Sequence, residues 1–187
     1  MHLQVEFSIN DRVEIANLTW SSSGDYLLYI DDKNNLVEYH PTSKEHIKRN
    51  TITVDIPIRM YLSPNDEYLI FVGSNDSNHD RSADKYVMNM SNNEAWQIST
   101  PKLTSLPDSP WSLDGKRVLL GYGGVNCGDG VALYDIHERK VCYKRDINDF
   151  SNIIAWDKLS NEVVVSKKDG SVWKVKLYSK GETQISP

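Results

Sequence analysis

The side chains most typical of a metal site lie in one polar stretch, where Asp76, Asn78 and Asp80 alternate along the chain. This spacing matches the first three ligands of a calcium loop. Such a loop also needs glycine at its sixth position and glutamate at its twelfth, where this chain has Arg81 and Val87. We therefore predict no metal and interpret the stretch as a solvated loop that can contact a partner.

The second candidate is the glycine-rich segment 121–130, which could suggest a phosphate-binding loop. A phosphate cradle requires a helix directly after its glycines and a lysine within the motif. Here a strand-like segment follows and the lysine is missing. The segment is better interpreted as a long hairpin loop, in which Tyr122 and Asn126 are candidate partner contacts.

Other catalytic patterns are missing from the sequence. The five histidines have no metal-ligand spacing, and no Gly-x-Ser-x-Gly nucleophile motif occurs. Carboxylates are so frequent in the loops that no acid pair stands out as a glycosidase pair. We predict no catalytic residue and no cofactor.

Length and charge limit the class of protein. The chain has 187 residues and a net charge of −5, which argues against a general nucleic-acid binder. No apolar run approaches the roughly 18 residues of a membrane span. The first ten residues include glutamate where a secretory signal would be apolar, so the expected location is cytoplasmic.

The elements that would hold the loops repeat along the chain. A stretch that joins a large apolar residue, a polar turn and an apolar run begins at Trp20, Leu62, Trp111 and Trp156. Consecutive starts are 42, 49 and 45 residues apart. A period of this length indicates a supersecondary unit copied in tandem, with the repeated large residues packed between units.

Each repeat contains about four short segments with strand-like patterns, and none has a sustained helical period. In the third repeat these segments are 109–111, 117–122, 131–134 and 141–145. We predict an all-β chain that forms a small β-propeller of four four-stranded antiparallel blades. Residues 1–187 then form a single domain, with repeats at about 11–54, 55–100, 101–147 and 148–187.

The segment Trp111-Ser-Leu-Asp-Gly-Lys-Arg-Val-Leu-Leu120, followed by Val131-Ala-Leu-Tyr-Asp135, resembles the blade motif of TolB-type and WD-repeat β-propellers. Asp169-Gly-Ser-Val-Trp-Lys-Val175 is similar to the third-strand entry of a WD-type blade. The resemblance extends over nearly the whole chain and implies a propeller that binds proteins. The chain departs from the family in having four repeats instead of roughly six to eight. It also lacks the Gly-His and Trp-Asp dipeptides at the WD-repeat positions.

Residues 3–9 alternate apolar and polar side chains ahead of the first repeat, which predicts an additional strand. We expect this N-terminal strand to complete the last blade and close a small ring, because closure removes an exposed sheet edge. An open fragment, or half of a dimeric ring, is the alternative. The expected state is therefore a monomer or a homodimer.

The loops between second and third strands, together with the links between blades, would share one face of the propeller. By our loop limits they contain eleven aspartates and six lysines or arginines, an excess of five acids that equals the net charge of the chain. An acidic face would attract a basic protein, although aspartate is also frequent in turns for purely structural reasons. The predicted partner-binding residues are Asp31, Asp32, Asp76, Asn78, His79, Asp80, Arg81, Asp84, Tyr122, Asn126, Asp129 and Asp149.

Three functions are consistent with these observations. The first is a non-enzymatic protein-binding propeller, such as an inhibitor or immunity protein that caps a basic toxin or enzyme. The second is a carbohydrate- or peptide-processing enzyme or its binding subunit. The third is a fragment or half-ring of a larger propeller scaffold.

Overall fold

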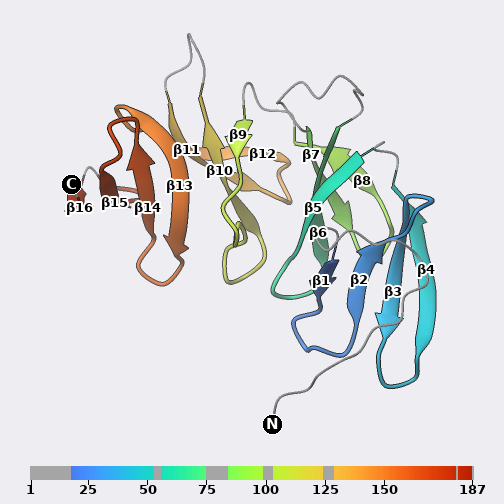
Figure 1. The fold of residues 1–187 in the computed structure, drawn as a ribbon. Helices are drawn as coiled ribbons and strands as arrows, with labels where there is room; N and C mark the ends of the chain where they lie inside the picture. Colours follow the sequence, from blue (N-terminus) through green and yellow to red (C-terminus); the bar gives the residue numbers. More distant parts are fainter. Residues whose placement is uncertain are drawn as a thin grey trace.

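The computed structural model describes residues 18–52, 56–74, 84–98, 103–123, 129–179 and 181–186. These residues form sixteen strands in four four-stranded antiparallel sheets, and every strand pairs with its neighbours in chain order (Figure 1). The expected all-β architecture with four-stranded blades is confirmed. Across these ranges there is no helix that could cross a membrane.

The four sheets are called blades 1 to 4 from the N-terminus. Blade 1 contains β1 (Leu18–Trp20), β2 (Leu27–Ile30), β3 (Asn35–His40) and β4 (Glu45–Thr51). Blade 2 contains β5 (Ile56–Leu62), β6 (Tyr68–Ser74), β7 (Asp84–Asn89) and β8 (Ala95–Gln97). Blade 3 contains β9 (Leu103–Ser105), β10 (Arg117–Tyr122), β11 (Gly130–Asp135) and β12 (Lys140–Asp146). Blade 4 contains β13 (Phe150–Asp157), β14 (Glu162–Lys167), β15 (Val172–Lys176) and β16 (Glu182–Ser186).

The repeated sequence motif is a turn between the first two strands of a blade, capped by serine in blades 1 to 3 and by Asp157 in blade 4. The hydroxyl oxygen of Ser63 accepts a hydrogen bond from the amide of Tyr68 at 2.9 Å, and that of Ser112 accepts one from the amide of Arg117 at 2.9 Å. Ser21 caps the turn of blade 1 in the same way, at 3.1 Å. The turn also needs a left-handed residue, which explains glycine, asparagine or aspartate at that position. The φ angles there are 77° at Gly24, 57° at Asp66, 67° at Gly115 and 54° at Asn161.

Neighbouring blades pack through apolar side chains that alternate along the strands. Leu28 and Ile30 of blade 1 pack against blade 2, and Tyr68 and Ile70 of blade 2 pack against blade 3. Blades 3 and 4 share the third core, which includes Leu119. Strands whose two faces are both buried have near-continuous apolar sequences, as β2, β6 and β10 do. In blade 4, β14 alternates buried and half-buried residues.

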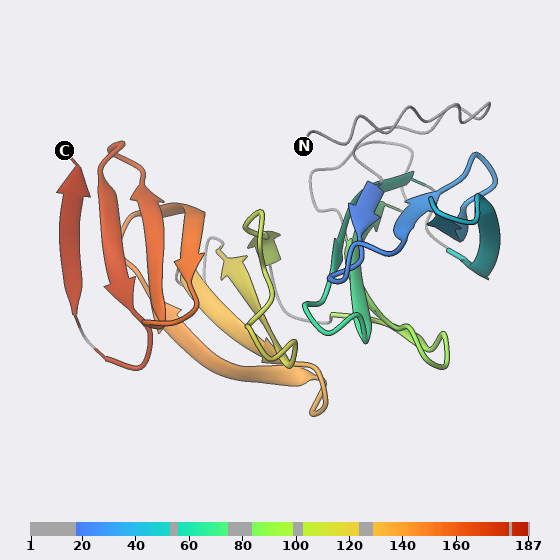
Figure 2. The same cartoon turned by 90° about the horizontal axis from the view of Figure 1, so that it is seen from below.

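The blades follow one another in a curved row. Figure 2 shows blade 1 at one end of the row and blade 4, with the C-terminus, at the other. Four blades in a ring would need four inter-blade cores, whereas the described residues form three. The expected closing strand, residues 3–9, lies outside the described residues, so its role stays a prediction.

Two details differ from the sequence-based expectation. The inner strand of blade 3 is β9, whereas the expected segment 109–111 contributes only the isolated bridge between Trp111 and Val118. Pro107 and Pro110 explain this, because proline cannot donate a hydrogen bond to a ladder. Trp111 is buried in an inter-blade core as expected, but Trp20 in blade 1 is 46% exposed.

Candidate functional site

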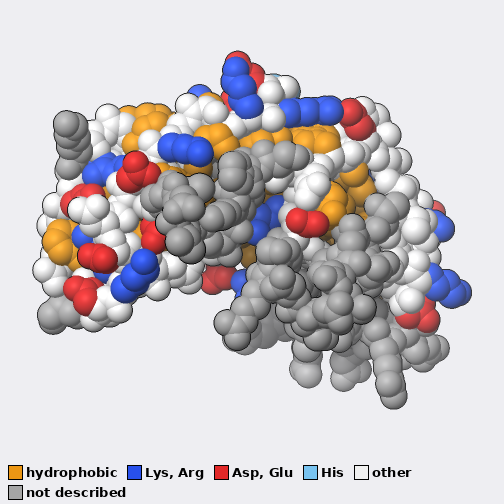
Figure 3. All heavy atoms as spheres, turned by 90° about the horizontal axis from the view of Figure 1, so that it is seen from above, with side chains coloured by type: hydrophobic (Ala, Val, Ile, Leu, Met, Phe, Trp, Pro, Cys, Tyr) orange, Lys and Arg blue, Asp and Glu red, His pale blue; other side chains and the backbone are white. Residues whose placement is uncertain are grey.

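The loop face is defined as the side that holds the β2–β3, β6–β7, β10–β11 and β14–β15 loops and the links between blades. Figure 3 looks onto this side, and acidic and basic side chains lie close together on its uncovered part. Seven of its aspartates are described, against four lysines or arginines. The aspartates are Asp31, Asp32, Asp84, Asp129, Asp146, Asp149 and Asp169.

Asp108, one of the eleven aspartates expected on this face, lies elsewhere. Asp108 follows β9 along the inner side of blade 3, where its carboxylate is 3.5 Å from the Arg59 guanidinium of β5. Its side chain is 96% exposed. Asp108 therefore contributes charge to the inner edge of the arc instead of the loop face.

In blade 1, Asp31 and Asp32 have different roles. The Asp31 carboxylate accepts hydrogen bonds from the backbone amides of Lys33 and Asn35, at 2.9 and 2.8 Å, and from the Asn35 side chain at 2.8 Å. Burial opposes its ionisation, but these hydrogen bonds outweigh burial and lower the pKa of Asp31. Asp31 thus fixes the β2–β3 turn, while Asp32 is exposed at its tip.

The junction of blades 3 and 4 brings together Tyr122, Asp129 and Asp149, with Asp146 and Lys168 between them. The Tyr122 hydroxyl donates to Asp146 Oδ1 at 2.5 Å, and Lys168 Nζ lies 3.0 Å from Asp129 Oδ2. The Lys168 amide donates to the Asp149 carbonyl oxygen at 2.7 Å, and the Asp149 side chain is exposed. The structure does not bring this group together with Asp31 and Asp32, which belong to the far end of the row.

Tyr122 is 4% exposed, so most of its ring packs inside the blade. Burial raises the pKa of its hydroxyl, and the hydrogen bond to Asp146 raises it further. Tyr122 is therefore a neutral donor at physiological pH. Its contribution to a binding surface is indirect, because it holds the exposed Asp146 carboxylate in place.

In blade 2, Asp84 is the first residue of β7 and is half-buried, with the Tyr86 hydroxyl 3.4 Å from its carboxylate. The next residue, Lys85, is 7% exposed. Burial lowers the pKa of Lys85, while Asp84 acts in the opposite direction. The remaining predicted contacts lie outside the described residues: Asp76, Asn78, His79, Asp80, Arg81 and Asn126.

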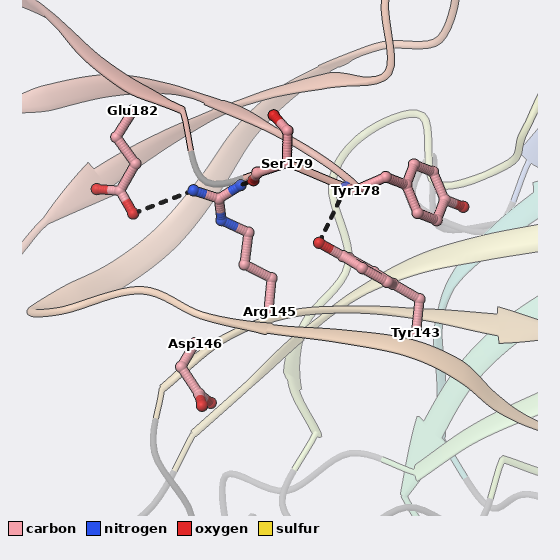
Figure 4. Close-up of a pocket in the computed structure, with 6 residues that line it drawn as sticks. All are labelled: Tyr143, Arg145, Asp146, Tyr178, Ser179 and Glu182. Atoms are coloured by element: carbon pink, nitrogen blue, oxygen red, sulfur yellow. Dashed lines mark hydrogen bonds and ion pairs between the residues drawn. The ribbon is translucent and has the colours of Figure 1, made fainter.

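A cavity of about 540 Å³ lies between β12 of blade 3 and the β15–β16 hairpin of blade 4 (Figure 4). The Arg145 guanidinium enters the hairpin, where it donates to the carbonyl oxygens of Lys176 and Ser179 and lies 3.4 Å from the Glu182 carboxylate. Lys167 is 3.5 Å from the same carboxylate. The single negative charge of Glu182 thus offsets one of the two positive charges of Arg145 and Lys167.

Two tyrosines form the other wall of this cavity. Tyr143 and Tyr178 have ring centroids 4.7 Å apart, and the Tyr143 hydroxyl accepts a hydrogen bond from the Tyr178 amide at 3.0 Å. The sequence does not reveal this pair, because Tyr178 belongs to a hairpin turn of the next blade. Its φ of 65° is uncommon for a bulky residue and provides no recognisable sequence signal.

Metal binding has no geometric support in the part of the chain that the structure describes. No three His, Cys, Asp or Glu side chains there are grouped as a metal site would require. The calcium-like spacing of residues 76–80 lies outside that part.

Comparisons with known proteins identify the fold. No family model matches the chain, and no curated protein matches its sequence. Among solved structures, it is similar to a putative TolB from Agrobacterium tumefaciens, with 13% identity and a TM-score of 0.59 over 94% of this chain. It is also similar to the Swd1 β-propeller domain of Myceliophteria thermophila, with 12% identity and a TM-score of 0.56 over 90% of this chain. The β-propeller domain of the Trilobed protease from Pyrococcus furiosus, described as having an open velcro topology, gives 14% identity and a TM-score of 0.59 over 94%.

These matches extend over only part of the similar structures. The chain spans 62%, 57% and 58% of the three chains, which is less than two thirds of each. Identities this low establish the fold and nothing finer. The chain therefore has the fold of a TolB-like and WD-repeat-type β-propeller, built from four blades.

Proposed function

We propose that this chain is a non-enzymatic, protein-binding β-propeller module that holds a basic partner on its loop face. The observation that supports this most directly is the exposure of Asp32 and Asp149 at separate points of that face. Both lie in loops fixed by a rigid sheet scaffold, which is where propellers place binding residues.

The local charge balance supports an acidic interaction surface. Arg145 and Lys167 share the single Glu182 carboxylate, and Lys168 pairs with Asp129. Seven described aspartates against four lysines or arginines still leave the loop face with an excess of three acids. An acidic face accelerates encounter with a basic protein and disfavours acidic competitors. In its most specific form, the proposal is an inhibitor or immunity protein that caps a basic toxin or enzyme in the cytoplasm.

The test uses the full chain as bait in a lysate of its source cell at low salt. One basic protein should be recovered in stoichiometric amount, and recovery should fall steeply as salt rises. Replacing Asp32 and Asp149 together by asparagine should weaken binding roughly tenfold, mainly through slower association. Asparagine is chosen because it tolerates the φ of 55° at Asp149.

The matched control replaces Asp25 by asparagine and Glu45 by glutamine, which removes two negative charges from exposed positions away from the loop face. This variant should bind like the parent chain. Equal binding by both double variants, or equal losses, would show that the loop-face acids do not recognise the partner.

A second candidate is that these four blades are part of a larger propeller scaffold or half of a dimeric ring. It is favoured because the described residues form three inter-blade cores, whereas a closed ring of four blades would need four. It is also favoured because the chain spans only part of the similar structures. The mass of the native protein, measured by light scattering, distinguishes a single 21.4 kDa chain from a longer chain or a pair. For an enzyme that processes carbohydrates or peptides, no described pair of carboxylates stands out as catalytic machinery.

A further inference from the structure

In blades 3 and 4, the hairpin turns on the side opposite the loop face expose large apolar side chains. We call this side the turn face. Leu113 in the β9–β10 turn is 57% exposed, Leu159 in the β13–β14 turn is 85% exposed, and Tyr178 in the β15–β16 turn is 54% exposed. All three belong to the adjacent blades 3 and 4. Clustered exposed apolar residues with polar neighbours are typical of interaction sites.

A cavity of about 220 Å³ opens among these turns. Leu113 and Tyr178 line it, together with Trp156 at the seam between the two blades. This volume is below the roughly 300 Å³ at which small-molecule pockets begin. It suits one large side chain of a protein partner better than a cofactor.

Two cations in the lining have no ion-pair partner among the described residues. Lys158 Nζ donates to the Ser109 hydroxyl at 2.7 Å. Arg117, exposed at the start of β10, is hydrogen-bonded to the side chain of Tyr178 and attracted by Asp114. Burial lowers the pKa of Lys158, so its charge is poorly solvated and would gain from an anionic acceptor. One carboxylate, Asp114, also lines the cavity and accepts hydrogen bonds from the Ser112 hydroxyl and the Lys116 amide, at 2.6 and 3.1 Å. These bonds lower the pKa of Asp114 and keep it charged, so the two cations leave the lining with one net positive charge.

The Trp156 indole adds an independent signal. Its Nε1 is buried and has no hydrogen-bond partner in the structure. A buried N–H without an acceptor costs free energy, and such groups are uncommon in folded proteins. An acceptor supplied by a ligand would remove that cost.

We propose that this cavity at the seam of blades 3 and 4 is a second docking site, which takes an extended peptide whose large apolar side chain is followed by an acidic residue. The apolar side chain fills the space beside Leu113 and Trp156, and the carboxylate meets Lys158 and Arg117. The charge preference is opposite to that of the loop face. The chain could therefore hold two different partners at once, on opposite faces.

The experiment titrates the full chain with blocked five-residue peptides that contain Leu-Glu, Leu-Gln or Leu-Lys at the centre. Binding is followed by NMR through the indole N–H signals, and a Trp156→Phe variant assigns the Trp156 signal. The Leu-Glu peptide should shift that signal and bind at least fivefold more tightly than the Leu-Gln peptide. The Leu-Lys peptide should bind most weakly.

Two variants locate the site without disturbing the core. Lys158→Met keeps the apolar stem and should remove the preference for Glu over Gln. Leu113→Ser, at an exposed position, should weaken the binding of all three peptides by a similar factor. Lys140→Met, at an exposed position of β12 outside the cavity, should change nothing. Failure of all peptides to bind, or equal binding of the three, would overturn the proposal.

Discussion

Tyr122, Gly130 and Asp146 form one cross-strand row in blade 3. Gly130 pairs with Tyr122 on one side and with Asp146 on the other. Because Gly130 has no side chain, the Tyr122 phenol reaches across it to the Asp146 carboxylate, at 2.5 Å. An aromatic residue that covers a glycine in this way restores packing that the glycine itself lacks.

We expect Tyr122→Phe to lower the free energy of unfolding by about 2 kcal/mol, because it removes a hydrogen bond to a charged acceptor. Urea unfolding followed by far-UV circular dichroism measures the loss. Asp146→Asn keeps an acceptor oxygen and should cost less. An equal or larger loss for Asp146→Asn would assign the effect to the aspartate's charge instead.

Tyr26 makes stability depend on alkaline pH. Burial raises its pKa to about 12 from 10.0, with further contributions from Asp66 and Glu38. Between these values the unfolded chain loses the proton while the folded chain keeps it, so the free energy of unfolding falls as pH rises. Tyr26→Phe should flatten this fall between pH 10 and 12 in urea titrations. If the free energy of unfolding of this variant falls as steeply with pH as that of the parent chain, groups other than Tyr26 cause the fall.

At the scale of strands and turns, Gly130 also sets how closely β11 and β12 approach. A Cβ added there would lie 2.1 Å from the Arg145 carbonyl oxygen, so the pairing would have to shift. We expect Gly130→Ala to cost about 1–3 kcal/mol, as overpacking does. Thermal unfolding measures this loss of stability. In the control Gly181→Ala, the nearest atom would lie 3.7 Å from the added Cβ, so stability should be almost unchanged.

The turns between strands could largely be predicted from the sequence, because they depend on local chemistry. Ser63 and Ser112 cap their turns, and the left-handed residues that follow are recognisable by type. The predicted position of β9 is wrong, although Pro107 and Pro110 argue against a strand at the expected segment 109–111. The Tyr143–Tyr178 contact could not be predicted, because it joins residues of two blades across a turn.

At the scale of the whole molecule, the outer face of blade 4 differs from the corresponding faces of blades 2 and 3. Lys174 occupies the position filled by Val87 in blade 2 and Leu133 in blade 3. It pairs with Glu162 at 2.9 Å, and Lys176 lies 3.8 Å from the same carboxylate. A polar outer face is typical of a terminal capping repeat. At this position blade 4 therefore has an ion pair where blades 2 and 3 have apolar side chains.

We therefore predict that replacing Glu162 and Lys174 together by leucine makes the outer face of blade 4 apolar and causes the protein to self-associate. Light scattering should show concentration-dependent association, because the new face resembles the interior faces of the other blades. The matched control, Glu138→Leu with Lys140→Leu, removes an exposed ion pair of β12 and its turn, where the carboxylate and ammonium are 2.9 Å apart. If both double variants associate equally, general surface hydrophobicity and not the end face is responsible.

The strictly sequential pairing of strands has a consequence for biosynthesis. Each sheet is complete once its own four consecutive strands have left the ribosome, since none borrows a described strand from a later segment. Contacts between elements close in sequence form quickly, and domains are generally ordered from the N-terminus during translation. Blade 1 can then act as a template on which blades 2, 3 and 4 dock one after another as synthesis proceeds.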